Sequence, residues 1–430
     1  MGNLWNVRDN QSETGERRHT VLVPEDGLIL ENLKLLQDVS SPEQRLLSCQ
    51  EDNIGQTFNN SLVAMAFILK GEKERAERIL DFYANSVDRD NVDRDLQNFY
   101  CAGEARGFYQ SINLRNEGDK SASYASGLTD RWMGDLVWLT LAFKYYEKIF
   151  GFSFKPVYSA ITKELLKLIV SFYQDDPNSG GYIQSGWRWG PYATRKRIEE
   201  LANQGTAISD FISRCGNDSP REEERELYQL LKEARNDDHL HEIEAGGHHE
   251  GNIDCYALLR LIGEDEKAGR IAKWLDLEIS RFKANDWNVY LDHVSWRALA
   301  CGRDFPALYE KLYILENDDR FRKTVQFNGK KTVGFYHKAD TDVNNLWNDG
   351  SGHMACAFYA AGDIEKGNFY ANQMDNLIID RIINGRHTHA IPYTANQSGP
   401  YGWVSLDKGF VSVSAWYIFA KNRFNPLDLR

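Results

Sequence analysis

The chain has 430 residues, of which 42% are hydrophobic and 12% aromatic. This composition supplies enough apolar surface for a substantial core and excludes an intrinsically disordered protein. The formal net charge of −12 argues against nucleic-acid backbones and anionic membrane surfaces as main partners.

Apolar and amphipathic helices are expected to alternate along the chain. Residues 1–23 read as an irregular lead-in, and a first helix is predicted at Leu28–Cys49. Leu62–Lys70 is rich in Ala, Met and Leu and is followed by Gly71, which is typical of a helix C-terminus. Lys73–Val87 places its apolar side chains on one face and its charges on the other, so it is predicted to be an amphipathic partner helix.

This pair of helices recurs as a unit of about 27–35 residues. An apolar helix needs cover on all sides, so we expect inner helices enclosed by amphipathic outer helices. Six such hairpins closing on themselves predict an all-α fold, an (α/α)6 toroid formed by a single domain over residues 1–430. The further predicted pairs are Leu128–Phe150 with Ser159–Tyr173, Gly251–Leu261 with Lys267–Ile279, Val294–Cys301 with Pro306–Leu315, Ser351–Ala361 with Ile364–Ile379, and Val411–Lys421 with the first helix.

Insertions of a different character separate the hairpins. Lys323–Phe335 alternates about an Asn-Gly pair, which predicts a short β-hairpin in a loop. Residues 174–245 are expected to be an insertion between hairpins, and Pro220–Asp238 within it is predicted to be a solvated, charged surface helix.

Cysteines and apolar runs give no sign of a zinc site, a disulfide framework or a membrane anchor. The six cysteines form no C-x-x-C pair, and the longest apolar run, Leu62–Leu69, is too short to span a bilayer. The first 20 residues are polar and lack a signal peptide. We expect a cytoplasmic protein, or an exported one whose signal has been removed.

Carboxylates gather in the polar loops that enter the apolar helices. In a closed toroid the N-terminal ends of the inner helices converge on one rim, where we expect the cleft. Paired carboxylates suit glycosidic bond cleavage, in which one protonates the leaving oxygen and the other activates water or attacks the sugar. Each acid alone is also explained by helix capping, but the accompanying Trp, His and Gly favour a catalytic site. The acids are Asp130, Asp135, Glu250, Asp254 and Asp349.

Tryptophans lie in or beside the same loops, where exposed indoles would stack on sugar faces, although core packing explains any single one. Trp187 and Trp189 are most typical of exposed, loop-borne platforms. His387 and His389 form an H-x-H, but no H-E-x-x-H or similar spacing is present, so hydrogen-bonded loop histidines are favoured over metal ligands. The sequence therefore predicts no metal site and no cofactor. It also contains no nucleophile elbow, Walker loop or dinucleotide-binding motif.

The chain resembles the six-hairpin glycosidase superfamily, and the resemblance runs from Gln56 to Pro426. It implies a general acid at the start of an inner helix, where Glu250 stands, and a base from another hairpin, where Asp135 and Asp349 stand. The segments that carry it are Gln56–Phe82, RWMGDLVWLTLAF (131–143), HHEGNIDCYALLRLIG (248–263), LWNDGSGHMACAFYAAGD (346–363) and VSAWYIFAKNRFNPL (413–427).

We therefore expect a cofactor-free glycoside hydrolase that acts on an oligo- or polysaccharide with inversion. The side chains expected to contact the sugar are Trp132, Arg131, Trp187, Trp189, His249, Asn252, Asp254, Trp296, Trp347, His353, Tyr393 and Trp403. Three alternatives stay open: a sugar epimerase using paired histidines, a carbohydrate-binding toroid without catalysis, and a polysaccharide lyase. The lyase would use a Tyr or His base and basic side chains drawn from Arg131, Arg188, Arg297, His249 and Tyr393.

Overall fold

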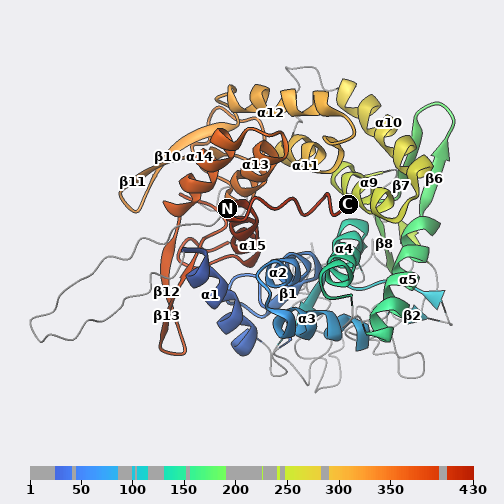
Figure 1. The fold of residues 1–430 in the computed structure, drawn as a ribbon, viewed down its shortest axis with the longest axis horizontal. Helices are drawn as coiled ribbons and strands as arrows, with labels where there is room; N and C mark the ends of the chain where they lie inside the picture. The colour runs from blue at the N-terminus through green and yellow to red at the C-terminus, as the bar shows by residue number, and fades with distance from the viewer. Residues whose placement is uncertain are drawn as a thin grey trace, which may run out of the picture.

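The computed structural model describes residues 25–40, 45–85, 99–101, 104–114, 130–151, 155–189, 225, 240–242, 247–281, 290–396 and 404–430. Within these residues the chain folds into twelve α-helices joined by short antiparallel strand pairs (Figure 1). The prediction of a helix-rich chain with short hairpins in its loops is confirmed. The lead-in 1–23, nearly all of the charged helix predicted at Pro220–Asp238, and Trp403 lie outside the described residues.

Six apolar helices, which we call the inner helices, pack against one another in chain order. Each contacts the next, and the last contacts the first, so the series of contacts closes. These helices are largely buried; in the last one, every residue except Lys421 is buried. The inner helices are α2 (Thr57–Leu69), α4 (Met133–Phe150), α9 (His249–Ile262), α11 (Leu291–Cys301), α13 (Asn348–Ala360) and α15 (Val411–Lys421).

A second set of helices covers the inner ones from outside (Figure 1). Each packs its apolar stripe on one inner helix, as the amphipathic pattern predicts. In α3, for example, Ala76, Ile79, Leu80 and Tyr83 are buried. The pairs are α3 (Lys73–Asn85) on α2, α5 (Pro156–Ser171) on α4, α10 (Asp265–Arg281) on α9, α12 (Tyr309–Glu316) on α11, α14 (Ile364–Asp375) on α13, and α1 (Glu25–Ser40) on α15.

Most helix boundaries differ from prediction by a few residues, and two of the differences have identifiable reasons. Helix α1 ends at Ser40 rather than Cys49, and Pro42 in the sequence explains the early end, because proline disrupts a helix interior. Helix α2 begins at Thr57, ahead of the predicted Leu62. Its polar first turns belong to the helix because Asn60 bonds Leu47, its Oδ1 accepting from the backbone nitrogen at 2.9 Å and its Nδ2 donating to the carbonyl oxygen at 3.0 Å.

The strands form small sheets in the connections between helices. The predicted hairpin is present as β10 (Arg322–Phe327) and β11 (Lys330–Phe335). The helix predicted at Ile364–Ile379 ends at Asp375, and a second hairpin follows it, formed by β12 (Ile379–Ile383) and β13 (Arg386–Ala390). The other pairings are β1 (Ile54–Gln56) with β4 (Ser111–Asn113), β2 (Tyr100–Cys101) with β3 (Glu104–Ala105), β6 (Tyr173–Asp176) with β7 (Gly180–Ile183), and β8 (Gly186–Trp189) with both β5 (Arg131–Trp132) and β9 (Leu240–Glu242).

Among the described helices, none combines the length and the apolar character needed to cross a membrane.

Candidate active site

The inner helices present equivalent residues at equivalent positions of their first two turns. Residues four apart share one helix face, so the second and sixth residues of each inner helix point the same way. In chain order the second residues are Phe58, Gly134, Glu250, Asp292, Asp349 and Ser412. The sixth residues are Leu62, Trp138, Asp254, Trp296, His353 and Trp416.

Three tryptophans of the sixth position meet and form what we call the aromatic floor. The side-chain centroids of Trp138 and Trp296 lie 5.6 Å apart, and those of Trp296 and Trp416 lie 6.4 Å apart. Phe58, one turn nearer the helix start, packs 5.6 Å from Trp138. Because these residues come from α2, α4, α11 and α15, the first turns of these inner helices lie together, as the sequence predicts for a common rim.

His353 is buried against the aromatic floor. Its imidazole lies 4.2 Å from the side chain of Trp416, and its Nδ1 accepts a hydrogen bond from Trp296 Nε1 at 3.0 Å. Burial lowers the pKa of His353 well below its ordinary value, so the imidazole is neutral at pH 7. Its Nε2 has no hydrogen-bond partner among the described residues.

Glu250 and Asp292 form a close carboxyl pair beside His293. One carboxylate oxygen of each and one imidazole nitrogen of His293 all lie within 4.8 Å of one another. Burial raises the pKa of Asp292 well above its ordinary value, and the charge and hydrogen bond of Glu250 raise it further. The side chain of Glu250 is 36% exposed and that of Asp292 only 11%. The protonated form is therefore favoured at the buried Asp292, and Glu250 faces solvent.

Asp254 lies one turn below Glu250 on the same face of α9. Burial raises its pKa well above the ordinary value, and the charge of Glu250 adds to the shift. Its Oδ1 has no hydrogen-bond partner among the described residues. Gly134 is the second residue of the neighbouring helix α4, and an added Cβ there would stand 3.3 Å from Asp254 Oδ2. Burial therefore favours the protonated form of Asp254.

Two neutral histidines stack beside the carboxyl pair. The imidazoles of His249 and His293 lie 4.8 Å apart with an interplanar angle of 22°. Burial, followed by the nearby charges of His248 and Arg297, lowers the pKa of His249 to about 4. Burial, together with His249 and His248, lowers the pKa of His293 to about 3. Both imidazoles are therefore neutral at pH 7.

Asp135 and Asp349, the bases expected from the sequence, make hydrogen bonds to neighbouring helices. Asp135 Oδ1 accepts from the backbone nitrogen of Phe58 at 3.0 Å and so caps the start of α2. Asp349 accepts from Ser412 Oγ, at 2.7 Å through Oδ2 and 3.0 Å through Oδ1. Burial raises the pKa of each to about 7, although these hydrogen bonds oppose the shift. Neither belongs to the group formed by Glu250, Asp292 and His293.

Aromatic side chains border these acids near the helix starts. Trp132, half-buried, precedes α4 and lies 6.1 Å from the imidazole of His248. Trp347 precedes α13 and lies 5.1 Å from His353 and 6.4 Å from Tyr393. Trp132 and Tyr393 are the more exposed of these rings.

Several residues expected to bind the sugar lie inside the protein. The expectation of an exposed platform at Trp187 is wrong, because the alternation of β8 turns its side chain inward, where it stacks on Phe172 at 4.4 Å. Arg131 is buried over the ring of Tyr109, with its guanidinium 4.3 Å from the ring centroid. The side chain of Trp189 lies outside the described part.

Two further residues predicted for the site, Asn252 and Arg297, bond to other parts of the protein. Asn252 accepts from the backbone nitrogen of Ile183 at 2.7 Å and donates to its carbonyl oxygen at 2.9 Å, which fixes β7 to α9. Arg297, a candidate for lyase chemistry, pairs with Asp276 of α10.

The sequence reasoning missed Asp292, His293 and Trp416. Asp292 and His293 stand in the predicted entry segment Leu291–Arg297 but were not selected as site residues. Alignment of the six apolar helices on their first residues is the signal that would have found them. It places Asp292 at the position of Glu250, and Trp416 at the position of Trp296.

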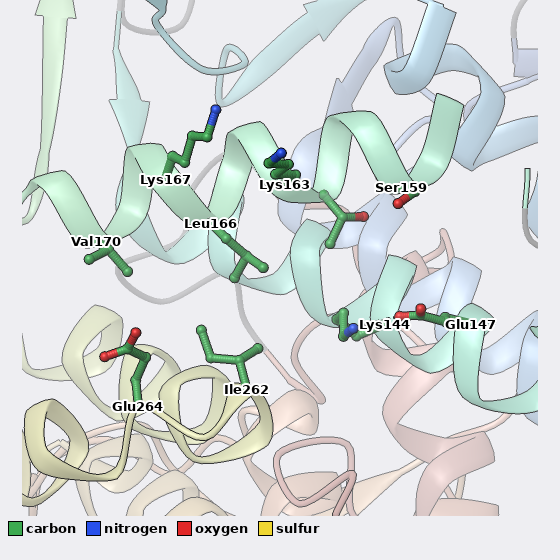
Figure 2. A pocket seen from close by; sticks show the side chains of 10 residues that line it. Lys144, Glu147, Ser159, Lys163, Leu166, Lys167, Val170, Ile262 and Glu264 are labelled. Carbon is green, nitrogen blue, oxygen red and sulfur yellow. Dashed lines mark hydrogen bonds and ion pairs between the residues drawn. The ribbon is translucent and has the colours of Figure 1, made fainter. Parts of the chain in front are cut away.

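A separate pocket lies near the C-terminal ends of the inner helices α4 and α9 (Figure 2). It opens between α5 and the last turns of α4 and α9, and Lys144, Lys163, Leu166, Ile262 and Glu264 line it. Lys144 is paired with Glu147 at 2.5 Å, and Glu264 with Lys267 at 2.7 Å. This pocket is distinct from the carboxyl pair, which lies at the helix starts.

Several solved structures are similar to this chain at low sequence identity. One is a glycosidase variant in complex with glucose, with 10% identity, 92% of this chain and 95% of that chain covered, and a TM-score of 0.49. Another is a family 76 glycoside hydrolase (mannosidase) from Bacteroides thetaiotaomicron, with 9% identity, 93% and 97% covered, and a TM-score of 0.45. A third is a D-mannose isomerase, with 10% identity, 94% and 100% covered, and a TM-score of 0.49. No protein-family model and no curated protein matches the sequence.

Proposed function

We propose that the chain forms one (α/α)6 toroid and acts as a glycoside hydrolase, with Asp292 as general acid and Glu250 as nucleophile. The carboxyl pair carries this proposal. It combines a buried carboxyl group whose pKa is raised with a solvent-facing carboxyl group, at the start of two adjacent inner helices. Glycosidic bond cleavage requires this combination, because the leaving oxygen must be protonated while a carboxylate attacks or activates water.

The spacing of the pair favours retention of anomeric configuration over the inversion expected from the sequence. The two carboxyl groups approach within 4.8 Å through their oxygens. Retaining enzymes hold their carboxyl groups about 5–5.5 Å apart, whereas inverting enzymes need about 6.5–9.5 Å to admit a water molecule. In the proposed reaction Glu250 attacks the sugar while Asp292 protonates the leaving oxygen. Asp292 then takes a proton from the water that releases the sugar from Glu250.

Trp132 and Tyr393 are proposed to contact the sugar at the borders of the site. The side chain of Asp292 is only 11% exposed, so it lies in a poorly hydrated environment. Such a setting maintains the raised pKa of Asp292 that general acid catalysis at neutral pH requires.

A reducing-end assay over neutral and acidic glycans tests this function. We expect hydrolysis of at least one glycan by the unaltered protein, and a loss of about 10²–10⁴-fold in rate for Glu250→Gln and for Asp292→Asn. Asp342→Asn, at an exposed aspartate, is the matched control and should keep the rate. Proton NMR of the first product should show the anomeric configuration of the substrate. Hydrolysis that survives both substitutions would exclude the pair as catalytic.

A sugar isomerase is the second candidate, and the stacked neutral imidazoles of His249 and His293 favour it. An imidazole that stays unprotonated at pH 7 can remove a proton from the carbon next to a sugar carbonyl. An isomerase would interconvert free monosaccharides and incorporate solvent deuterium at that carbon, without releasing new reducing ends. His293→Asn should abolish such exchange, whereas a hydrolase should show no exchange at all.

A further inference from the structure

The β12–β13 hairpin brings two histidines and an aspartate together on one face. His387 and His389 are two residues apart on β13, so their side chains point to the same side. On β12, Asp380 stands directly opposite His389, and Ile382 stands opposite His387. The H-x-H motif seen in the sequence offers two ligands, and the strand register adds a third from a residue that the motif does not contain.

The three donor atoms converge at the spacing of metal ligands. Asp380 Oδ1 lies 2.9 Å from His387 Nε2 and 3.3 Å from His389 Nε2, and all three donor atoms lie within 4.8 Å of one another. Around a tetrahedral Zn²⁺ with bonds of about 2.0–2.1 Å, neighbouring ligand atoms are about 3.3 Å apart. An ion can therefore replace the hydrogen-bonding proton with little movement of these side chains.

The opposite face of the hairpin is fixed to the rest of the protein. Thr388 Oγ1 accepts from Asn32 Nδ2 at 3.0 Å, and Arg381 makes two bonds to the Glu51 carboxylate, at 2.6 and 3.0 Å. Arg386 pairs with Glu31 of α1 at 2.5 Å. These anchors hold the strand register, and so the three donors, in place without the ion. They also direct the nearby guanidinium groups away from the donor face.

We propose that Asp380, His387 and His389 bind a divalent first-row transition metal ion, with Zn²⁺ as the best match, and clamp β12 to β13. Two imidazole nitrogens and one carboxylate oxygen suit Zn²⁺, whereas Mg²⁺ and Ca²⁺ prefer oxygen ligands alone. The side chains of Asp380 and His387 are 77% and 57% exposed, so the ion has direct access from solvent and water completes its coordination. The hairpin lies at the edge of the molecule (Figure 1), and this site is independent of the proposed hydrolase activity.

Zinc titration of the chelator-treated full chain by isothermal titration calorimetry tests the proposal. We expect one Zn²⁺ per chain at the hairpin, and a rise in the unfolding midpoint of about 3 °C at a free Zn²⁺ concentration 100 times the Kd. Asp380→Ala, His387→Ala and His389→Ala should each weaken this binding at least tenfold. Ile382→Ala is the matched control, because it alters the same face of the hairpin without removing a donor.

A second variant separates this site from the catalytic one. Glu250, Asp292 and His293 form the other group of potential ligands among the described residues, so Glu250→Gln is titrated in parallel. Retained binding in Glu250→Gln and Ile382→Ala, with loss in the three donor variants, supports the hairpin site. Unchanged affinity in folded donor variants, as judged by circular dichroism, or loss in Glu250→Gln alone, overturns it.

Discussion

Burial determines the protonation state of the acids around the aromatic floor. Asp135, Asp254, Asp292 and Asp349 all have raised pKa values, with burial as the largest cause of each. The side chain of Glu250, in contrast, is 36% exposed. At the scale of single residues, the site therefore combines buried carboxyl groups with raised pKa values and one solvent-facing carboxyl group.

The raised pKa values of these buried acids make the stability of the folded chain depend on pH, and a substitution at Asp349 isolates the contribution of one of them. The pKa of Asp349 is about 7 in the folded chain and near its ordinary value of 3.8 when unfolded. The contribution of Asp349 to the stability of the folded chain is thus fully present below about pH 4. It falls as the pH rises towards 7 and is lost above pH 7. Asp349→Asn keeps an acceptor for Ser412 Oγ and cannot ionise. The free energy of unfolding of Asp349→Asn should therefore exceed that of the unaltered protein by more at pH 8 than at pH 4. We expect the excess to grow by about 2–4 kcal/mol between these two pH values.

Urea unfolding at pH 4, 6 and 8 measures this difference, with Asp342→Asn as the exposed control. An equal effect of Asp349→Asn at all three pH values would show that Asp349 is already ionised in the folded chain.

At the scale of elements, local patterns in the sequence predicted structure well. Helix α15 begins at Val411 and ends at Lys421 as predicted, and the Asn-Gly pair at 328–329 forms the predicted hairpin turn. Asn328 and Gly329 have φ of 48° and 75°, the left-handed values that favour this pair in a two-residue turn. Asn384-Gly385 repeats the signal with φ of 49° and 74°, so β12 and β13 were also predictable.

The parts that escaped prediction depend on contacts between distant segments. Asn60 reads as a loop residue, but it lies inside α2 because its side chain bonds the backbone of Leu47. Trp187 reads as exposed, but β8 pairs with β5 and turns it onto Phe172. The partnership of Glu250 with Asp292 follows from the packing of α9 on α11, which no short segment contains.

Two glycines with equal space around them should respond oppositely to alanine. An added Cβ meets no atom within 4 Å at Gly329 or at Gly269. Gly329 has φ of 75°, where alanine is strained, so Gly329→Ala should lower the free energy of unfolding by about 1 kcal/mol. Gly269 lies inside α10, where alanine favours the helix, so Gly269→Ala should raise it by about 0.5–1 kcal/mol. Chemical denaturation of both variants measures the two signs, and the same sign for both would refute this explanation.

At the scale of the whole molecule, the end of the chain helps to join its distant parts. The segment after α15 runs across towards α4 and α9 (Figure 1), where Lys148 Nζ donates to the carbonyl oxygen of Leu429 at 2.6 Å. Arg430 pairs with Asp304 at 2.8 Å, and Asp304 also accepts from Tyr256 of α9 at 2.7 Å. Asp304 therefore connects α9, the segment after α11 and the final residue.

A double-mutant cycle on this connection tests its contribution. Burial raises the pKa of Asp304, but hydrogen bonds from Tyr256, Arg260 and Arg430 outweigh it and hold the pKa at about 2. The ionised Asp304 carboxylate thus stabilises the folded chain above about pH 4, and this stabilisation is lost as the pH falls through 2. Asp304→Asn and Arg430→Ala should show a coupling energy of about 1 kcal/mol at pH 7 that diminishes towards pH 2. Additive effects at pH 7 would mean that the two residues act separately.

The central claim is that Glu250 and Asp292, brought together by the packing of α9 on α11, act as one catalytic unit. The most direct test is kcat/KM for hydrolysis by Glu250→Gln, Asp292→Asn and the variant with both changes. Residues that act as a unit are strongly non-additive, so we predict that the double variant loses no more activity than the more damaging single one, about 10²–10⁴-fold. Losses that multiply in the double variant, or a double variant that retains full activity, would contradict the claim.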